Sequence, residues 1–153
     1  MKRSHHIMPA VCGLITVLTA MVIFRFSAQD SGQSNGLSQG IAAWVLGLLP
    51  VPETPESLEL ANLILRKLAH FSAYSLLGFG LTGVAGQQKR VPVLPAVILL
   101  GGLFALSDEF HQSFSPGRSP SLWDVGLDTC GAAAGWGVFE LVRRIREKRD
   151  SRS

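Results

Sequence analysis

Four long apolar runs constrain the fold of this chain more than any other feature of its sequence. They cover about residues 7–24, 68–85, 91–106 and 122–142; a long stretch with its own shorter apolar segment separates the first two, and short segments separate the others. A helix of eighteen residues rises roughly 27 Å, which nearly spans the ~30 Å hydrocarbon core of a bilayer. Charged residues make up only 16% of the 153-residue chain, against about 25% in a typical soluble domain. The sequence therefore predicts one all-α domain, an integral membrane four-helix bundle.

The first apolar run has two interpretations, a cleaved signal peptide or a permanent membrane anchor. Residues 7–24 are long for the apolar core of a signal peptide, and no small-x-small cleavage site follows at a suitable distance. Arg25 can extend its charged end toward the interface. We expect an uncleaved span that follows a short cytoplasmic N-terminus at residues 1–6.

A shorter apolar segment at residues 37–49 follows a polar loop predicted for residues 26–35. Thirteen residues are too few to cross a bilayer as a helix, so the segment predicts a short interfacial or re-entrant helix after the first span. Thr54 before Pro55 is typical of a helix N-cap followed by proline at the first helical position. The next helix is predicted over residues 56–85.

The boundaries of the last two helices follow from length and from proline. The sixteen apolar residues 91–106 rise only about 24 Å, so their helix is predicted to continue through residues 107–112. Ser119 before Pro120 predicts the N-cap of the final helix. The basic segment 143–153 is predicted to be a frayed cytoplasmic tail.

The distribution of lysine and arginine predicts how the chain is threaded. With the N-terminus inside, ten of these residues lie on the cytoplasmic side, and four lie outside or near the outer face. Such a bias marks cytoplasmic segments, so both termini are predicted to be cytoplasmic in a multi-pass protein of the cell membrane. Because the basic residues flank apolar runs, the net charge of +3 does not indicate a nucleic-acid partner. The bilayer is the expected partner, and the sequence leaves the oligomeric state open.

In this threading, three helix ends that carry polar side chains meet at the outer leaflet. An isolated acid inside a span costs about 2.5–3.5 kcal/mol on insertion scales, so such residues face the bundle interior and find partners. Asp108 and Glu109 are adjacent and point about 100° apart on a helix, so we expect at most one of them to face the site squarely. The sequence predicts an extracytoplasmic polar site made of Arg66, Lys67, His70, Tyr74, Asp108, Glu109, Gln112, Arg118, Asp124 and Asp128.

Gly131 and Gly135 form a GxxxG pattern, which lets a neighbouring helix approach closely. They lie three and seven residues after Asp128, so the small face and the acidic face of this helix nearly coincide. Asn62, Arg66, His70 and Tyr74 recur every four residues and form one stripe along the second span. We expect packing at the glycines to bring Asp128 against this stripe. Ordinary helix packing, without a role for the acid, is the alternative.

Three sequence motifs occur together in this chain, and their combination is specific although each alone is weak. They are Phe26-Ser27-x-Gln29, then Lys67-x-x-His70-Phe71-x-x-Tyr74-x-x-Leu77-Gly78, and Asp108-Glu109-x-x-Gln112-x-Phe114-x-Pro116-x-Arg118 followed by Asp124, Asp128 and Gly131-x-x-x-Gly135. On these residues the chain resembles the VanZ-like family of small membrane proteins, from about residue 26 to residue 137.

The resemblance implies a four-span bundle and carries over no catalytic role. The family is named for a protein that raises resistance to the glycopeptide teicoplanin. Relatives often have asparagine at the position of Asp128, so the acid here adds a potential charge. Pairing with Arg66 or protonation would offset that charge.

Three classes of function remain open from the sequence. The first is binding or handling of a lipid-linked or cell-wall-related headgroup, with a family-level association to glycopeptide susceptibility. The second is a membrane enzyme acting on a lipid headgroup with His70 as acid or base, although HExxH, GxSxG and phosphatase-type motifs are missing. The third is a small proton-coupled transporter. A polar network that only holds helix ends together is the structural alternative.

A metal site is not predicted. Asp108, His111 and Asp124 offer suitable ligand atoms, but no ligand spacing characteristic of a metal site connects them. The sequence predicts neither a metal nor a cofactor.

Overall fold

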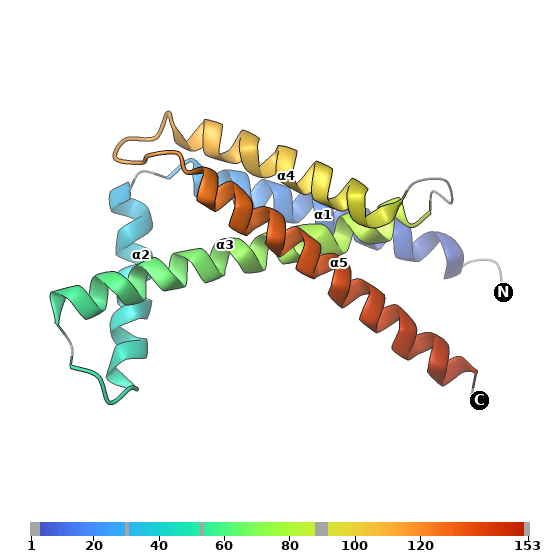
Figure 1. Ribbon diagram of the computed structural model, residues 1–153, viewed down its shortest axis with the longest axis horizontal. Helices are drawn as coiled ribbons and strands as arrows, with labels where there is room; N and C mark the ends of the chain where they lie inside the picture. Colours follow the sequence, from blue (N-terminus) through green and yellow to red (C-terminus); the bar gives the residue numbers. More distant parts are fainter. Residues whose placement is uncertain (1–3, 30, 53, 88–91, 152–153) are drawn as a thin grey trace.

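The computed structural model describes residues 4–29, 31–52, 54–87 and 92–151. Within these ranges the chain forms five α-helices and no strand, which confirms the all-α prediction. The helices are α1 (Ser4–Ser27), α2 (Ser31–Gly47), α3 (Pro55–Ala85), α4 (Val93–Gln112) and α5 (Leu122–Asp150) (Figure 1).

Helix α3 organises the arrangement, because it packs against each of the other four helices. α1 and α4 run lengthwise beside it, whereas α5 crosses it obliquely and extends past the bundle at its C-terminal end (Figure 1). α2 lies across the direction of the other helices (Figure 1). The described ends of the chain lie at one end of the bundle, and the α4–α5 connection lies at the other.

Three helices of the described chain are long and apolar enough to cross a membrane. These stretches are Met8–Ser27, Pro55–Ala85 and Val93–Gln112, and they overlap three of the four predicted spans. Their outward faces carry exposed large apolar side chains, Leu14 and Leu99 among them. Such faces match lipid surroundings better than water, so the fold is of the membrane type.

Helix α5 does not meet the same standard of length and composition, although it contains 29 residues. Three acids, Asp124, Asp128 and Glu140, interrupt its apolar residues and lower its mean hydropathy. The fourth span therefore stays a prediction.

The connection between α1 and α2 is shorter than predicted. α1 continues to Ser27 and α2 begins at Ser31, so the proposed loop over residues 26–35 is mostly helical. α2 contains 17 residues and begins upstream of the predicted segment 37–49. The loop was predicted because polar residues interrupt the apolar pattern there. Backbone hydrogen bonds within a helix do not depend on side-chain polarity, so the helix can continue through polar residues.

The C-terminal segment also differs from the prediction of a frayed tail, because α5 continues to Asp150. Arg143 pairs with Glu140 at 2.7 Å and with Glu147 at 2.9 Å. Pairs spaced three and four residues apart stabilise a helix by a few tenths of a kcal/mol each. These two pairs explain why the helix extends into the basic segment.

One predicted helix cap is confirmed and one is wrong. Thr54 caps α3 as expected, and Ser57 completes a reciprocal capping box with it. At α5 the N-cap is Ser121 and not Ser119, and it makes no side-chain capping bond. Instead, the backbone N–H of Ser121 donates to Glu109 Oε2 at 2.7 Å. A side chain from α4 therefore takes the place of the missing cap.

Glycines set the close packing of α3 against α5. A Cβ on Gly131 would lie 2.7 Å from the carbonyl oxygen of Phe71. A Cβ on Gly135 would overlap the carbonyl of Ser75. Both carbonyls belong to α3, so the GxxxG pattern lies at the helix contact where it was expected.

Candidate functional site

A stripe of polar residues on α3 forms one wall of the candidate site. Asn62, Arg66, His70 and Tyr74 recur every four residues and share one face of the helix. Tyr74 is fully buried and Asn62 is buried, while Arg66 and His70 are partly exposed. Both ends of the stripe are therefore buried, and its middle is open at Arg66 and His70.

Asp128 of α5 meets this stripe at His70, as the sequence predicted. The Asp128 Oδ2 atom lies 3.4 Å from His70 Nδ1, and only 1% of the Asp128 side chain is exposed. Gly131 lies one turn further along α5, and its contact with α3 brings the two backbones close enough for this pair. The structure thus pairs Asp128 with His70, and a pairing with Arg66 stays a prediction.

Asp108 of α4 completes a cluster of three residues, which we call the buried triad: His70, Asp108 and Asp128. One ligand-type atom from each of these side chains lies within 4.8 Å of the other two. Asp108 is 2% exposed, and its Oδ2 atom accepts a hydrogen bond of 3.1 Å from Gln112 Nε2. Three separate helices therefore converge on this point.

The remaining predicted acids belong to other contacts. Glu109 turns away from the triad and holds the start of α5 through Ser121, so of the adjacent pair Asp108 and Glu109 only Asp108 joins it. Asp124 forms an ion pair with Lys67, which joins α5 to α3. These residues fasten helix ends together around the triad.

His111 lies outside the triad as well. Its ring packs against Phe24 of α1 with ring centroids 4.3 Å apart. The ligand set considered from the sequence, Asp108, His111 and Asp124, is therefore not the set that the fold brings together. The triad shares only Asp108 with it.

A pocket of about 390 Å³ opens beside the triad, between α1, α2 and α3. We name it the headgroup pocket after the lipid headgroup that the sequence suggested as one possible ligand. Arg66, His70 and Arg118 line it together with the polar residues Gln29 and Ser38. Its other lining residues are apolar and are Val22, Ile23, Phe26, Ile41, Leu65, Ala69 and Ala73. The pocket thus combines two guanidinium groups with an apolar wall, and His70 borders both the pocket and the triad.

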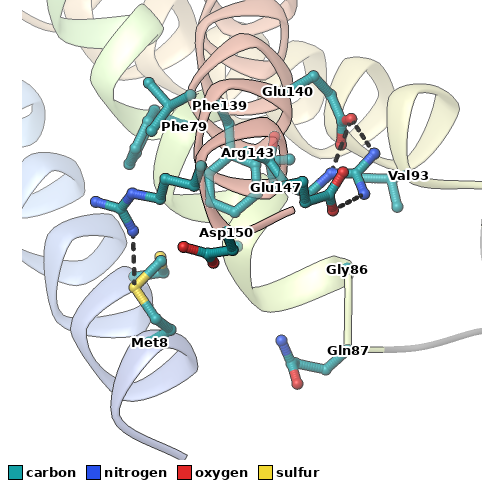
Figure 2. A pocket seen from close by; sticks show the side chains of 15 residues that line it. Met8, Phe79, Gly86, Gln87, Val93, Phe139, Glu140, Arg143, Glu147 and Asp150 are labelled. Carbon is teal, nitrogen blue, oxygen red and sulfur yellow. Dashed lines mark hydrogen bonds and ion pairs between the residues drawn. The ribbon is translucent and has the colours of Figure 1, made fainter. Parts of the chain in front are cut away.

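A second pocket, of about 510 Å³, lies near the chain ends, and we call it the basic-end pocket (Figure 2). Met8 of α1 and Gly86 at the end of α3 line one side, and Glu140, Arg143 and Glu147 of α5 line another. Glu140, Arg143 and Glu147 pair along α5 itself, and Arg146 reaches the sulfur of Met8 on α1 at 4.0 Å (Figure 2). This pocket is larger than the headgroup pocket, and the ion pairs that border it lie within a single helix.

Sequence reasoning missed one contributor to the site and one close helix contact near the basic-end pocket. Ser27 is 1% exposed, and its hydroxyl lies close to the Asp108 carboxylate. Its place directly after the first span, inside the motif Phe26-Ser27-x-Gln29, was the available signal. Gly83 packs against Cys12 so closely that a Cβ would overlap the Cys12 side chain, which sets α1 against α3. No pattern on α1 indicated that contact.

The fold and the apolar helix faces define an α-helical protein of the membrane type with a polar site at one end of its bundle. Within that class the family is clear, because the family model VanZ/LLP1 matches residues 12–143. The chain belongs to the VanZ/LLP1 family, which confirms the resemblance drawn from its motifs. No curated protein and no solved structure matches the chain.

Proposed function

We propose that this protein binds the anionic headgroup of a lipid-linked or cell-wall-related precursor at the outer face of the cell membrane. The observation that carries the proposal is the headgroup pocket, in which Arg66 and Arg118 lie at the edge of an apolar wall. Guanidinium groups bind phosphate and carboxylate oxygens through paired hydrogen bonds. The wall formed by Val22, Ile23 and Phe26 suits the adjoining hydrocarbon chain. A ligand with both parts is an amphiphile with a negative headgroup.

The proposal includes four spans with both termini in the cytoplasm, which places the headgroup pocket outside. The acids that lower the hydropathy of α5 do not have to face lipid. Asp128 is buried against His70, and Asp124 pairs with Lys67. Glu140 pairs with Arg143 where the span would end. Pairing within the bundle removes much of the insertion cost of these acids, so α5 is a suitable fourth span.

Binding is best tested with ligands that differ only in charge. The purified protein in lipid nanodiscs would be titrated with a polyprenyl phosphate and with the uncharged polyprenol, and inorganic phosphate would serve as competitor. We expect the phosphate to bind at least tenfold more tightly than the alcohol. Inorganic phosphate alone should compete weakly, because it cannot use the apolar wall. Equal binding of the two lipids would contradict the proposal.

Substitutions then locate the binding. Arg118→Gln should weaken phosphate-lipid binding about tenfold or more, because it removes a charge-assisted contact. Arg144→Gln is the matched control, since Arg144 is an exposed arginine of α5 outside both pockets. If both variants bind equally well, the headgroup pocket is not the binding site. A family link to glycopeptide susceptibility would be tested in cells that express these same variants.

A second candidate function is an enzyme acting on the bound headgroup. The observation that favours it is the His70–Asp128 pair at the border of the pocket, because a carboxylate can orient an imidazole that acts as general base or acid. This function predicts turnover of the phosphate lipid, detected by mass spectrometry. His70→Gln should reduce turnover by a hundredfold or more while leaving lipid binding within a few fold. Binding without turnover would contradict the enzyme and support lipid binding as the only function of the pocket.

A further inference from the structure

The buried triad raises a question that lipid binding does not answer, because it places two carboxylates together inside a membrane-type bundle. Asp108 and Asp128 are 2% and 1% exposed. Even if His70 is protonated, the three side chains carry one net negative charge when both acids are ionised. Buried charges persist only where they are paired or bind a cation. A cation beside the triad must balance this charge; the Arg118 guanidinium lies within electrostatic reach of His70, and a bound metal ion or a proton can supply the rest.

Both carboxylates also present an oxygen that nothing satisfies. Oδ1 of Asp108 and Oδ1 of Asp128 have no hydrogen-bond partner among the residues that the structure describes. Their other oxygens are already engaged, by Gln112 and by His70 respectively. An unsatisfied buried acceptor costs about 1–3 kcal/mol, and more when it is charged. Two such atoms in one cluster indicate a missing ligand.

Two neighbouring hydroxyls share this feature. The hydroxyl of Tyr74, which is fully buried, and that of Ser27 likewise lack a hydrogen-bond partner within the described chain. Ser27 lies close to Asp108, and Tyr74 lies within the electrostatic reach of both acids. The unsatisfied atoms thus gather around the triad, on α1, α3, α4 and α5.

We infer that His70, Asp108 and Asp128 form a binding site for a divalent transition-metal cation. The geometry is close to what such an ion needs. Donors at about 2.1 Å from a tetrahedral ion lie about 3.4 Å from one another. His70 Nδ1 and Asp128 Oδ2 are already 3.4 Å apart, and all three ligand atoms lie within 4.8 Å. A separation of 4.8 Å would have to close by about 1.4 Å to reach that spacing, a shift that side-chain rotation can supply.

The donor set also selects the kind of cation. An imidazole nitrogen with two carboxylate oxygens suits Zn²⁺ or Mn²⁺, whereas Mg²⁺ prefers oxygen ligands and retains its waters. Affinity at such a site rises from Mn²⁺ to Zn²⁺. Gln112 donates to Asp108 and so acts as a positioning residue for that ligand. Because His70 also borders the headgroup pocket, the ion would lie near the bound anion and strengthen its attraction.

The first measurement is metal content and affinity. Two adjacent histidines, His5 and His6, could bind metal by themselves, so the tag-free protein would carry His5→Ala and His6→Ala. After dialysis against Zn²⁺ we expect about one bound equivalent per chain by elemental analysis. Calorimetric titration should show Zn²⁺ binding more tightly than Mn²⁺, with Mg²⁺ weaker by at least a hundredfold. Less than a tenth of an equivalent of Zn²⁺ would overturn the inference.

Substitutions separate this site from adventitious binding. Asp108→Asn and Asp128→Asn keep the side-chain size and should each weaken Zn²⁺ binding at least tenfold. Asp124→Asn is the matched control, because Asp124 lies one turn from Asp128 on α5 and pairs with Lys67 instead. It should bind Zn²⁺ within twofold of the parent. Equal binding in all three variants would overturn the site.

A fourth variant gives a result that a merely structural role would not produce. Asp128→Cys replaces an oxygen ligand with sulfur and should shift the preference toward Cd²⁺ over Mn²⁺ by at least tenfold. If the variants fail to fold, the melting temperature of the parent protein tests the site. A chelator should lower this melting temperature, and Zn²⁺, but not Mg²⁺, should restore it. A melting temperature that chelator leaves unchanged would contradict the inference. Lipid titrations with and without Zn²⁺ measure whether lipid binding depends on the metal. A failure of the metal site can then be told apart from a failure of the proposed lipid binding.

Discussion

The two ends of the bundle hold charged groups in opposite ways. At the basic-end pocket, Arg143 bridges Glu140 and Glu147 along the surface of one helix (Figure 2). At the other end, His70 and Asp128 pair across two helices inside the bundle. The first arrangement is local and exposed, and the second requires that α3 and α5 pack correctly.

This difference shows which charged groups lower the stability of the folded protein. Exposed ion pairs contribute about 0–1 kcal/mol and cost little to form. Buried, partly satisfied acids are destabilising unless something completes their contacts. Pocket volume alone would favour the basic end as the functional site, because the basic-end pocket measures about 510 Å³ and the headgroup pocket about 390 Å³. Burial and convergence of polar groups, and not volume, therefore identify the candidate functional end.

The largest expected effect breaks the polar end by separating its helices. Gly135→Leu should abolish the folded bundle, because even a Cβ at this position overlaps the Ser75 carbonyl of α3. The measurement is thermal unfolding and monodispersity in detergent. Gly137→Ala is the control on the same helix, since a Cβ there meets nothing within 4 Å. It should be neutral or stabilise by about 0.5–1 kcal/mol. Similar behaviour of both variants would contradict the packing account.

The second prediction tests which end faces outward. In a background with Cys12→Ala and Cys130→Ala, Ser119→Cys should react with a membrane-impermeant maleimide added to intact cells. Ser151→Cys should react only after the cells are opened. Both serines are exposed in the structure, so access is decided by the membrane and not by the fold. The reverse labelling pattern would place the headgroup pocket in the cytoplasm and refute the proposed topology.

A smaller effect is expected at the rim of the polar end. Lys67→Ala should cost about 0.5–1 kcal/mol, because Lys67 and Asp124 pair across helices but their side chains are 40% and 28% exposed. A double-mutant cycle with Asp124→Ala measures the coupling by chemical or thermal unfolding. A coupling free energy well above 1 kcal/mol would mean that the Lys67–Asp124 pair is not a weak surface ion pair, and would contradict this account of the rim.

The smallest effect is expected at the basic end. Arg143→Ala should leave the melting temperature of the bundle unchanged within error, because its pairs are exposed and lie within α5. Hydrogen bonding to Glu140 raises the pKa of Arg143, so the group stays cationic throughout the neutral range. Stability measured from pH 6 to pH 9 should therefore be the same in both proteins. A clear loss in the variant would mean that the projecting part of α5 supports the bundle.

Much of the site was predictable because a helix repeats every 3.6 residues. The spacing of Asn62, Arg66, His70 and Tyr74 is enough to place them on one face of α3. The Gly131 and Gly135 spacing places Asp128 on the packing face of α5 in the same way. The N-terminus of α3 was predictable from Thr54 and Pro55, because capping is local chemistry.

Other features depended on contacts that the local pattern does not contain. The start of α2 and the length of α5 were mispredicted because a change between polar and apolar residues does not by itself end a helix. Ser121 takes its cap from Glu109, which lies on another helix. His111 packs on Phe24, and no rule of spacing within α4 relates those two rings.

The sequence by itself determined that the chain is helical, that apolar runs suit a membrane, and which residues share a face of each helix. Only the tertiary structure decided that Asp128 pairs with His70 among the residues of its stripe, that Asp108 joins them, and that Asp124 pairs with Lys67. The physical reason is that periodicity orders side chains within a helix, whereas the rotation and offset between helices come from close packing at glycines such as Gly131 and Gly135. That packing is a property of two surfaces at once, and no single segment contains it.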